Sequence, residues 1–358
     1  MTETRSGAAA IDALVDWDLA VRTASRLVRP GPQVSRAEAA DVVAQLHDFA
    51  ARSTHHVAET TQLQTRPGDN VLVIDRPRWV RANVDAFRTM LAPVVEDAVT
   101  KRKHAPSPLV SAVGSRITGA EVGSLLSFLA SRVLGQYDAF DPGGGRLLLV
   151  APNVVHVERE MAVEPRDFRL WVCLHEETHR VQFQATPWLR DHLLDRIRAL
   201  VGDLIGEPGA VLDRLTSGLR NLPDVLRGSD NGTGLLDLVQ TPEQRRALAE
   251  VTAVMSLLEG HADVVMDDVG PSVIGTVDEI RRKFTQRRAG RGAVGQLLRR
   301  LLGLDAKMRQ YADGAKFVRG AIDAVGVGGF NAVWSAPEHL PTPEEISTPR
   351  SWVRRIHG

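Results

Sequence analysis

The stretch WVCLHEETHRVQF, residues 171–183, holds the pattern HExxH in His175, Glu176 and His179. Each residue of an α-helix advances by about 100°, so these two histidines lie one turn apart on the same face. Two imidazoles in that arrangement can bind one tetrahedral Zn²⁺ ion. Glu176 lies on the flank of this face, where its carboxylate can take a proton from a water molecule on the metal. The stretch therefore predicts a zinc site with its general base.

The helix that carries this pattern is apolar over most of its circumference, which is typical of a core helix. We expect it to begin near Pro165, with Asp167 as its N-cap, and to end near Ala185 before Pro187. Burying charged groups without partners is costly. The burial of two histidines and two glutamates in such a helix therefore needs an explanation, and a bound metal ion would provide one.

HExxH is short enough to arise by chance. In a chain with 11 histidines among 358 residues, a random match is expected in on the order of one such chain in fifty. A zinc site therefore needs a third ligand. One class of zinc peptidases extends the pattern to HExxHxxGxxH. Gln182 and Ala185 stand where that glycine and that third histidine would be, so this class is excluded.

A candidate third ligand comes from SLLEGHADVVMD, residues 256–267, where Glu259 and Asp263 lie four apart in an apolar stretch. On a helix both side chains face the same way, and we expect both to be buried. Glu259 would bind the zinc, and Asp263 would hold a ligand histidine by its other ring nitrogen. Two alternatives stay open. The two carboxylates could form a solvated or salt-bridged face, or the third ligand could be Asp191 or His192.

Four segments of the chain are distinctive when they are taken together: HEETHRVQF (175–183), LEGHADVVMD (258–267), KMRQYADGAKFV (307–318) and GFNAVWSAPEHLPTPEEI (329–346). They resemble a family of zincin-like metallopeptidases associated with the biosynthesis of a deazaflavin coenzyme. The resemblance covers most of the chain and implies a mostly helical zincin fold. It also implies a zinc ion on His175, His179 and Glu259, with Glu176 as the base, but it implies no substrate.

The chain departs from thermolysin-like enzymes in one respect, because Glu259 follows His179 at a greater distance along the sequence. The segment 206–234, which is rich in Gly, Pro, Asn and Asp, would fill that gap. We expect this segment to be a long insertion.

Peptide hydrolysis also needs a group that stabilises the oxyanion, and related enzymes often use a tyrosine or a histidine. The chain has two tyrosines, of which Tyr311 follows the Glu259 helix and could reach the site. The alternative is a helix tyrosine with its hydroxyl in water. His156, which we expect on a strand just before the HExxH helix, could line a substrate groove, although such a histidine is more often only a strand residue.

The apolar spacing predicts a mainly α protein with a small β-sheet, an α+β class. We expect strands at 70–75 and in 146–157, where two β-rich runs flank Ala151-Pro152-Asn153. The tail from Trp334 on contains several prolines and is expected to be irregular. Helices are expected at 8–28, 36–52, 80–102, 118–136, 189–204, 242–268, 277–302 and 304–325.

Composition narrows the classes of partner. Lys+Arg and Asp+Glu both total 44, and because polyanion-binding proteins carry a basic excess, nucleic acid is not expected as a partner. We interpret the basic run 281–292 as a solvated helix face. The single cysteine, Cys173, allows no internal disulfide, which favours a cytoplasmic protein. No run of about 18 apolar residues occurs, so a membrane partner is not expected.

These observations predict a zinc-dependent metallohydrolase, in the first instance a peptidase, with Zn²⁺ as cofactor and a peptide or small amide as substrate. We expect a helical lobe with the sheet over 1–160 and a zinc-binding lobe over 161–358, integrated around a cleft. Two other classes stay open: a zincin-fold binding or structural protein without catalysis, and a zinc hydrolase of a small non-peptide amide. An open groove beside an edge strand would favour the peptidase. The sequence does not predict the oligomeric state.

Overall fold

The computed structural model describes residues 12, 15–64, 70–101, 108–141, 143–206, 241–289 and 304–358. Within these ranges it leaves out the side chains of 94–101, 108–117, 201–206, 288–289 and 304–312. The described chain is mainly helical with one small sheet, which confirms the predicted α+β class.

The chain divides into two compact units. The first comprises Met1–Ala185 with Asp268–Lys283, and the second comprises Thr186–Asp267 with Phe284–Gly358. The expected division into one lobe over 1–160 and another over 161–358 stays a prediction.

A three-stranded sheet organises the first unit. It consists of β1 (Val71–Ile74), β2 (Gly135–Asp138) and β3 (Arg146–Val150), in the order β1-β3-β2. β1 runs parallel to β3, and β2 runs antiparallel to it. The strand expected at 70–75 is thus confirmed. Because β3 is central, β2 is an edge strand of this sheet.

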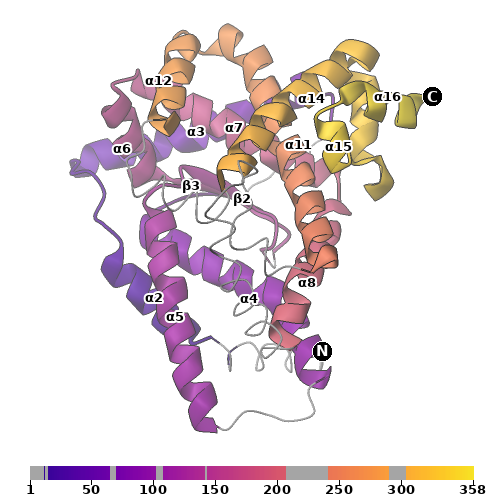
Figure 1. Ribbon diagram of the computed structural model, residues 1–358. Helices are drawn as coiled ribbons and strands as arrows, with labels where there is room; N and C mark the ends of the chain where they lie inside the picture. Colours follow the sequence, from indigo (N-terminus) through magenta and orange to yellow (C-terminus); the bar gives the residue numbers. More distant parts are fainter. Residues whose placement is uncertain are drawn as a thin grey trace, which may run out of the picture. The chain divides into compact units, whose positions relative to one another are not determined.

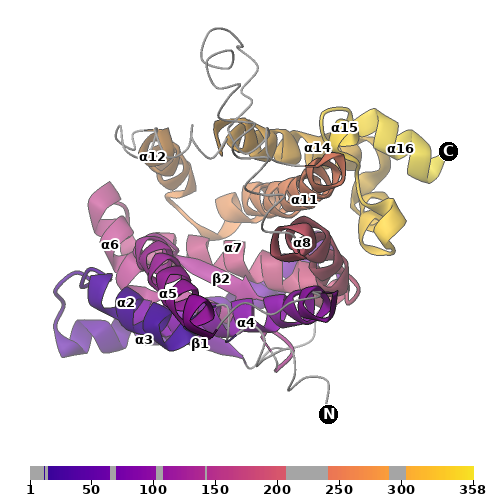
Figure 2. The ribbon, with the colours of Figure 1, turned by 60° about the horizontal axis from the view of Figure 1, so that its bottom comes forward.

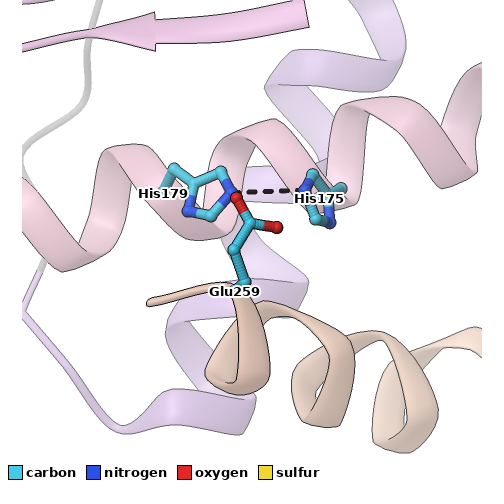
Figure 3. A group of neighbouring side chains, drawn as sticks. All are labelled: His175, His179 and Glu259. Carbon is cyan, nitrogen blue, oxygen red and sulfur yellow. Dashed lines mark hydrogen bonds between the residues drawn. The ribbon is translucent and has the colours of Figure 1, made fainter. Parts of the chain in front are cut away.

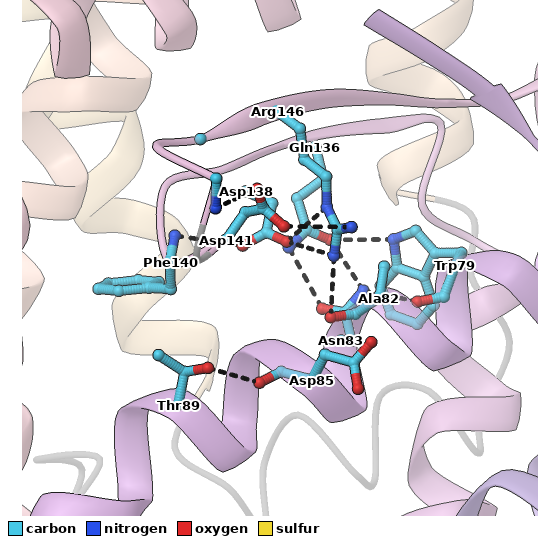
Figure 4. A network of polar contacts seen from close by, with 12 residues as sticks. Trp79, Ala82, Asn83, Asp85, Thr89, Gln136, Asp138, Phe140, Asp141 and Arg146 are labelled. Atoms are coloured by element: carbon cyan, nitrogen blue, oxygen red, sulfur yellow. Dashed lines mark hydrogen bonds and ion pairs between the residues drawn. The ribbon is translucent and has the colours of Figure 1, made fainter. Parts of the chain in front are cut away.

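Side chains alternate along β2 between the two faces of the sheet. Gln136 accepts a hydrogen bond of 2.9 Å from the Trp79 indole nitrogen at the start of α4 (Arg76–Lys101). Asp138, on the same face, forms an ion pair of 3.0 Å with Arg146 on β3. Figure 4 shows this polar network between the strands and α4. Gly135 and Tyr137 therefore lie on the other face.

That other face packs against α7 (Pro165–Ala185), the helix that contains HExxH, and α7 also packs against α3 (Arg36–Thr61). The position and length of α7 agree closely with the prediction. In the same unit, α2 (Trp17–Leu27) and α5 (Pro108–Ala130) run side by side (Figures 1 and 2). α12 (Val277–Ala289) is attached to this unit by Lys283, which donates 2.8 Å to the carbonyl of Ala162.

One predicted strand is a helix. The β-rich run after Pro152 belongs to α6 (Ala151–Met161) and not to a second strand. Pro152 stands in the first turn of α6, where its fixed φ favours helix and its missing N–H costs nothing. The valines of this run are buried in the helix, so tertiary packing overrides their preference for strands. His156 therefore lies on a helix, half-exposed, with its ring 4.0 Å from Glu160.

Helices make up most of the second unit, and its described residues include no strand. Its long helices are α8 (Leu189–Gly206), α11 (Pro242–Val273, to Asp267 within this unit) and α14 (Leu304–Phe330). The short elements η1 (Asn331–Trp334), η2 (Pro337–His339), α15 (Pro343–Ile346) and α16 (Pro349–His357) follow. The expectation of an irregular tail was wrong, because three of its four prolines, Pro337, Pro343 and Pro349, stand in the first turns of helices, where they favour helix.

The tail packs onto α14 around one tryptophan. Trp352 is fully buried, and its ring lies 5.7 Å from that of Phe317 on α14. Its indole nitrogen donates 2.7 Å to the carbonyl of His339. Burial of a large aromatic side chain with its polar atom satisfied contributes strongly to stability. The tail is therefore part of the core of this unit.

None of the helices in the described part of the chain is both long enough and apolar enough to cross a membrane.

Candidate metal centre

α7 enters the core with its first turn anchored to a distant segment. Asp167, expected as the N-cap, lies inside the first turn of the helix. Its carboxylate accepts hydrogen bonds from the backbone N–H of Thr276 at 2.9 Å and from the Thr276 hydroxyl at 2.7 Å. Asp167 thus ties the loop before α12 to α7, and the N-cap prediction was wrong.

His175 and His179 lie side by side on α7, as their spacing predicted. Their Nε2 atoms are 3.2 Å apart, and the two rings meet edge to face (Figure 3). Both side chains are half-buried. The Nδ1 atom of His179 lies 2.9 Å from the amide oxygen of Gln182. An acceptor at that position favours the tautomer with the proton on Nδ1, in which the lone pair of Nε2 could bind a metal.

Glu176 lies next to the edge strand. Its side chain is only 7% exposed. A Cβ atom added to Gly135 on β2 would lie 2.5 Å from Cγ and 2.9 Å from Oε1 of Glu176. Such distances are too short for real contacts, so the carboxylate occupies space that only a glycine leaves open. Gly135 was not found from the sequence, because nothing local marks residue 135 as a neighbour of residue 176.

The second glutamate of the motif helix has a different partner. Glu177 is fully buried and forms an ion pair with Arg180, whose Nε atom is 2.8 Å from the carboxylate. Arg180 also donates 3.0 Å to the Thr54 hydroxyl on α3. The charge of Glu177 is thus compensated within the core, as buried charges require. Its burial is therefore explained by Arg180 and needs no metal ion.

Cys173 lies on the α3 side of the same helix. It is fully buried, with its sulfur 3.7 Å from the carbonyl of Leu46. Burial is the largest of the effects that raise the pKa of this thiol well above its usual value. A protonated thiol is a poor metal ligand and a poor nucleophile. Cys173 is therefore a packing residue.

Glu259 lies on α11, directly after two buried leucines, and is half-buried itself. Asp263, one turn further along, is exposed. The expectation that both carboxylates would be buried was therefore wrong for Asp263. The error arose because buried neighbours in the sequence do not determine the environment of one position on a helix.

One ligand atom from each of His175, His179 and Glu259 lies within 4.8 Å of the others, and together they form a group that could hold a metal ion (Figure 3). Two imidazoles and one carboxylate are the donors that zinc prefers in catalytic sites with one open position. Neither Asp191 nor His192 belongs to this group, the one found among the described residues. His192 instead packs edge to face on Trp188.

Two sequence predictions fall outside the described residues. The side chain of Tyr311 is among those left out, although its backbone belongs to α14. Of the expected insertion at 206–234, only Gly206 is described, at the end of α8. The second tyrosine is Tyr137 on β2, and its ring lies 5.6 Å from the tilted ring of Phe183 on α7. Burial is the main cause that raises the pKa of its hydroxyl.

The chain matches known proteins over nearly its whole length. The profile of the zincin-like metallopeptidases matches residues 15–353, nearly the whole chain. A crystal structure of a proposed hydrolase with a novel fold, from Chloroflexus aurantiacus, is similar with 31% sequence identity and a TM-score of 0.68. The match covers 96% of this chain and 99% of that one. No curated protein shows a significant match.

Proposed function

The chain belongs to the zincin-like metallopeptidase family, and on this premise we propose that it is a zinc-dependent hydrolase that cleaves peptide bonds. The observation that carries the proposal is the group formed by His175, His179 and Glu259, whose ligand atoms lie within 4.8 Å of one another. Glu176 follows His175 directly on the same helix, at the position of a general base. The deazaflavin association stays a prediction.

His175, His179 and Glu259 would hold the metal, and their donor types fit zinc. When bound, Zn²⁺ supplies a Lewis acid that polarises a carbonyl and lowers the pKa of water. Gln182 orients His179 by accepting a hydrogen bond from its Nδ1–H group. We assign the same orienting role toward a ligand histidine to Asp263.

Glu176 would transfer a proton during hydrolysis. Its carboxylate would accept one from the attacking water and deliver it to the leaving nitrogen. Because Gly135 has no side chain, this carboxylate can occupy its position next to β2. Tyr311 stays the candidate for stabilising the oxyanion.

The position of β2 favours a peptide over a small amide as substrate. Within the described sheet, β2 pairs with a neighbour on one side only, and Glu176 lies against its backbone at Gly135. The free edge of a strand can bind an extended peptide through main-chain hydrogen bonds. A substrate bound in this way would pass beside the general base. This arrangement is the specific support for peptidase activity over the other two classes.

The first experiment measures metal content by mass spectrometry in protein purified without added metal. We expect one zinc per chain in the wild type, and none in the His175→Ala and Glu259→Ala variants. Zinc that survives Glu259→Ala would remove Glu259 from the ligand set. Wild-type protein without zinc, even after reconstitution, would overturn the proposed function.

The second experiment tests catalysis on a peptide library with the zinc-loaded protein. The matched control is Glu176→Gln, which keeps the size of the side chain and the metal ligands but removes the base. We expect cleavage by the wild type and none by the variant. Zinc-loaded wild type that cleaves no peptide would favour the binding protein or the small-amide hydrolase.

A further inference from the structure

We propose that Gly260 and Gly314 are positioning residues for the metal centre, because their contact sets where α11 carries Glu259. This inference rests on the proposed function, in which Glu259 is a ligand. It assigns a role to the segment 307–318, one of the four distinctive segments of the sequence, which the proposed chemistry otherwise uses only through Tyr311.

The contact joins the backbones of α11 and α14. A Cβ atom added to Gly260 would lie 2.2 Å from the carbonyl carbon of Gly314 and 2.4 Å from the backbone nitrogen of Ala315. A Cβ atom added to Gly314 would lie 2.0 Å from the carbonyl oxygen of Ser256. Each glycine therefore faces the backbone of the other helix. No side chain separates the helices at this point.

Both glycines lie inside helices, where glycine is the least favourable residue apart from proline. A glycine at such a position usually serves close packing or function. Here Gly260 faces the backbone of Gly314, and Gly314 faces the backbone of Ser256 one turn earlier on α11, so the close approach of the helices accounts for both glycines. Most helix pairs are held further apart by the side chains at their contact.

α14 has little freedom to retreat from α11. Phe317, three residues after Gly314 on α14, packs on the fully buried Trp352 of α16. A Cβ atom added to Gly320 would lie 3.1 Å from the Pro349 ring, so α14 and α16 are also close there. An added methyl group at the glycine contact would therefore move α11 as well as α14.

Glu259 immediately precedes Gly260, so it moves with this part of α11. Non-bonded carbon atoms prefer separations of roughly 3.5 to 4 Å. Relieving the overlap at 2.2 Å would thus shift the helices by roughly 1 Å. Ligand distances in zinc sites are defined to within roughly 0.2 Å. A shift of this size would therefore weaken the bond from Glu259 while leaving the histidines on α7 in place.

The test compares Gly314→Ala and Gly260→Ala with Gly328→Ala. Gly328 lies in the last part of α14, after the kink at the non-helical Gly326, and a Cβ atom there would have nothing within 4 Å, so the same substitution adds no contact. Zinc affinity is measured by competition with a chelator, and ligand geometry by the visible spectrum of the Co²⁺ form. We expect affinity at least about tenfold weaker and a changed Co²⁺ spectrum in the first two variants. Gly328→Ala should match the wild type in both.

A double-mutant cycle separates positioning from general damage. The Glu259→Ala background is titrated with added zinc, because it should retain none on purification. If Gly314 acts through Glu259, then Gly314→Ala should weaken this residual binding no further. Wild-type affinity and spectrum in a folded Gly314→Ala or Gly260→Ala protein would overturn the inference. So would equal losses with and without Glu259, or failure of both variants to fold. Wild-type protein that binds no zinc would instead overturn the proposed function.

Discussion

Two adjacent glutamates on α7 have opposite surroundings at the scale of single residues. Glu176 points toward the edge strand and fills the space left by Gly135. Glu177, about 100° further around the helix, is fully buried in an ion pair with Arg180. In the proposed mechanism, the first carries out proton transfer. The second is neutralised within the core, and its charge serves the packing of α7 on α3.

The role of Gly135 can be tested by the Gly135→Ala substitution. The added methyl group would displace the carboxylate of Glu176, because the new Cβ would lie 2.5 Å from its Cγ atom. A misplaced general base loses part of a contribution of about 100-fold or more. We expect kcat to fall at least about tenfold with the zinc content unchanged.

The measurement is steady-state kinetics on a peptide identified in the library, with metal content determined on the same samples. Glu176→Gln serves as the reference for complete loss of the base. Unchanged kcat in Gly135→Ala would show that the carboxylate finds its working position elsewhere. Loss of zinc together with activity would show that Gly135 supports the metal ligands and not the base.

At the scale of secondary structure, the sequence predicted elements well where a periodic pattern met a clear stop. α7 was predicted because its apolar pattern extends over several turns and Pro187 follows it. α6 was missed because valine-rich runs favour strands, and only packing onto α3 and α7 makes this one helical. The tail was missed because prolines that begin helices look the same in sequence as prolines that prevent them.

The same contrast between local sequence patterns and tertiary packing applies to the metal centre. The grouping of His175, His179 and Glu259 could be predicted, because the spacing within each motif determines on which face of its helix a side chain lies. Gly135 could not, because it meets Glu176 only through the packing of β2 on α7. The distance between two positions in a folded chain is determined by tertiary packing, and no local pattern records it.

The tail allows a prediction about pH. Burial by itself would raise the pKa of Glu345 at the start of α15, but hydrogen bonds from Arg355 and from the backbone N–H of Thr342 lower it on balance. A carboxyl group whose pKa is lowered in the folded state stabilises that state above its unfolded pKa, about 4.3. This stabilisation is lost as the pH falls through the folded value.

We therefore expect Glu345→Gln to be less stable than the wild type at pH 7 and to approach it as the pH falls below about 4. Chemical denaturation of both proteins at a series of pH values measures the difference. Glu344→Gln, the neighbouring residue, is the control, and it should show no such convergence. A difference that is constant with pH would mean that the hydrogen bonds of Glu345, and not its charge, stabilise the tail.

At the scale of the whole molecule, metal binding and folding should be coupled. A ligand that binds only the folded chain stabilises it by RT ln(1 + [L]/Kd), about 2.7 kcal/mol when free zinc is 100 times Kd. The unfolded chain lacks the site, because Glu259 and the two histidines lie far apart in sequence. Zinc should therefore raise Tm, and a chelator should lower it.

Thermal unfolding followed by circular dichroism, with and without zinc, measures this coupling. We expect a rise in Tm of a few degrees for the wild type and no rise for His175→Ala. Glu176→Gln should respond like the wild type, because it lacks the base but keeps all three ligands. If Glu176→Gln lost the response, Glu176 would have to be counted among the metal ligands. Retention of the response in His175→Ala would place the zinc elsewhere, so this comparison tests the ligand set without any substrate.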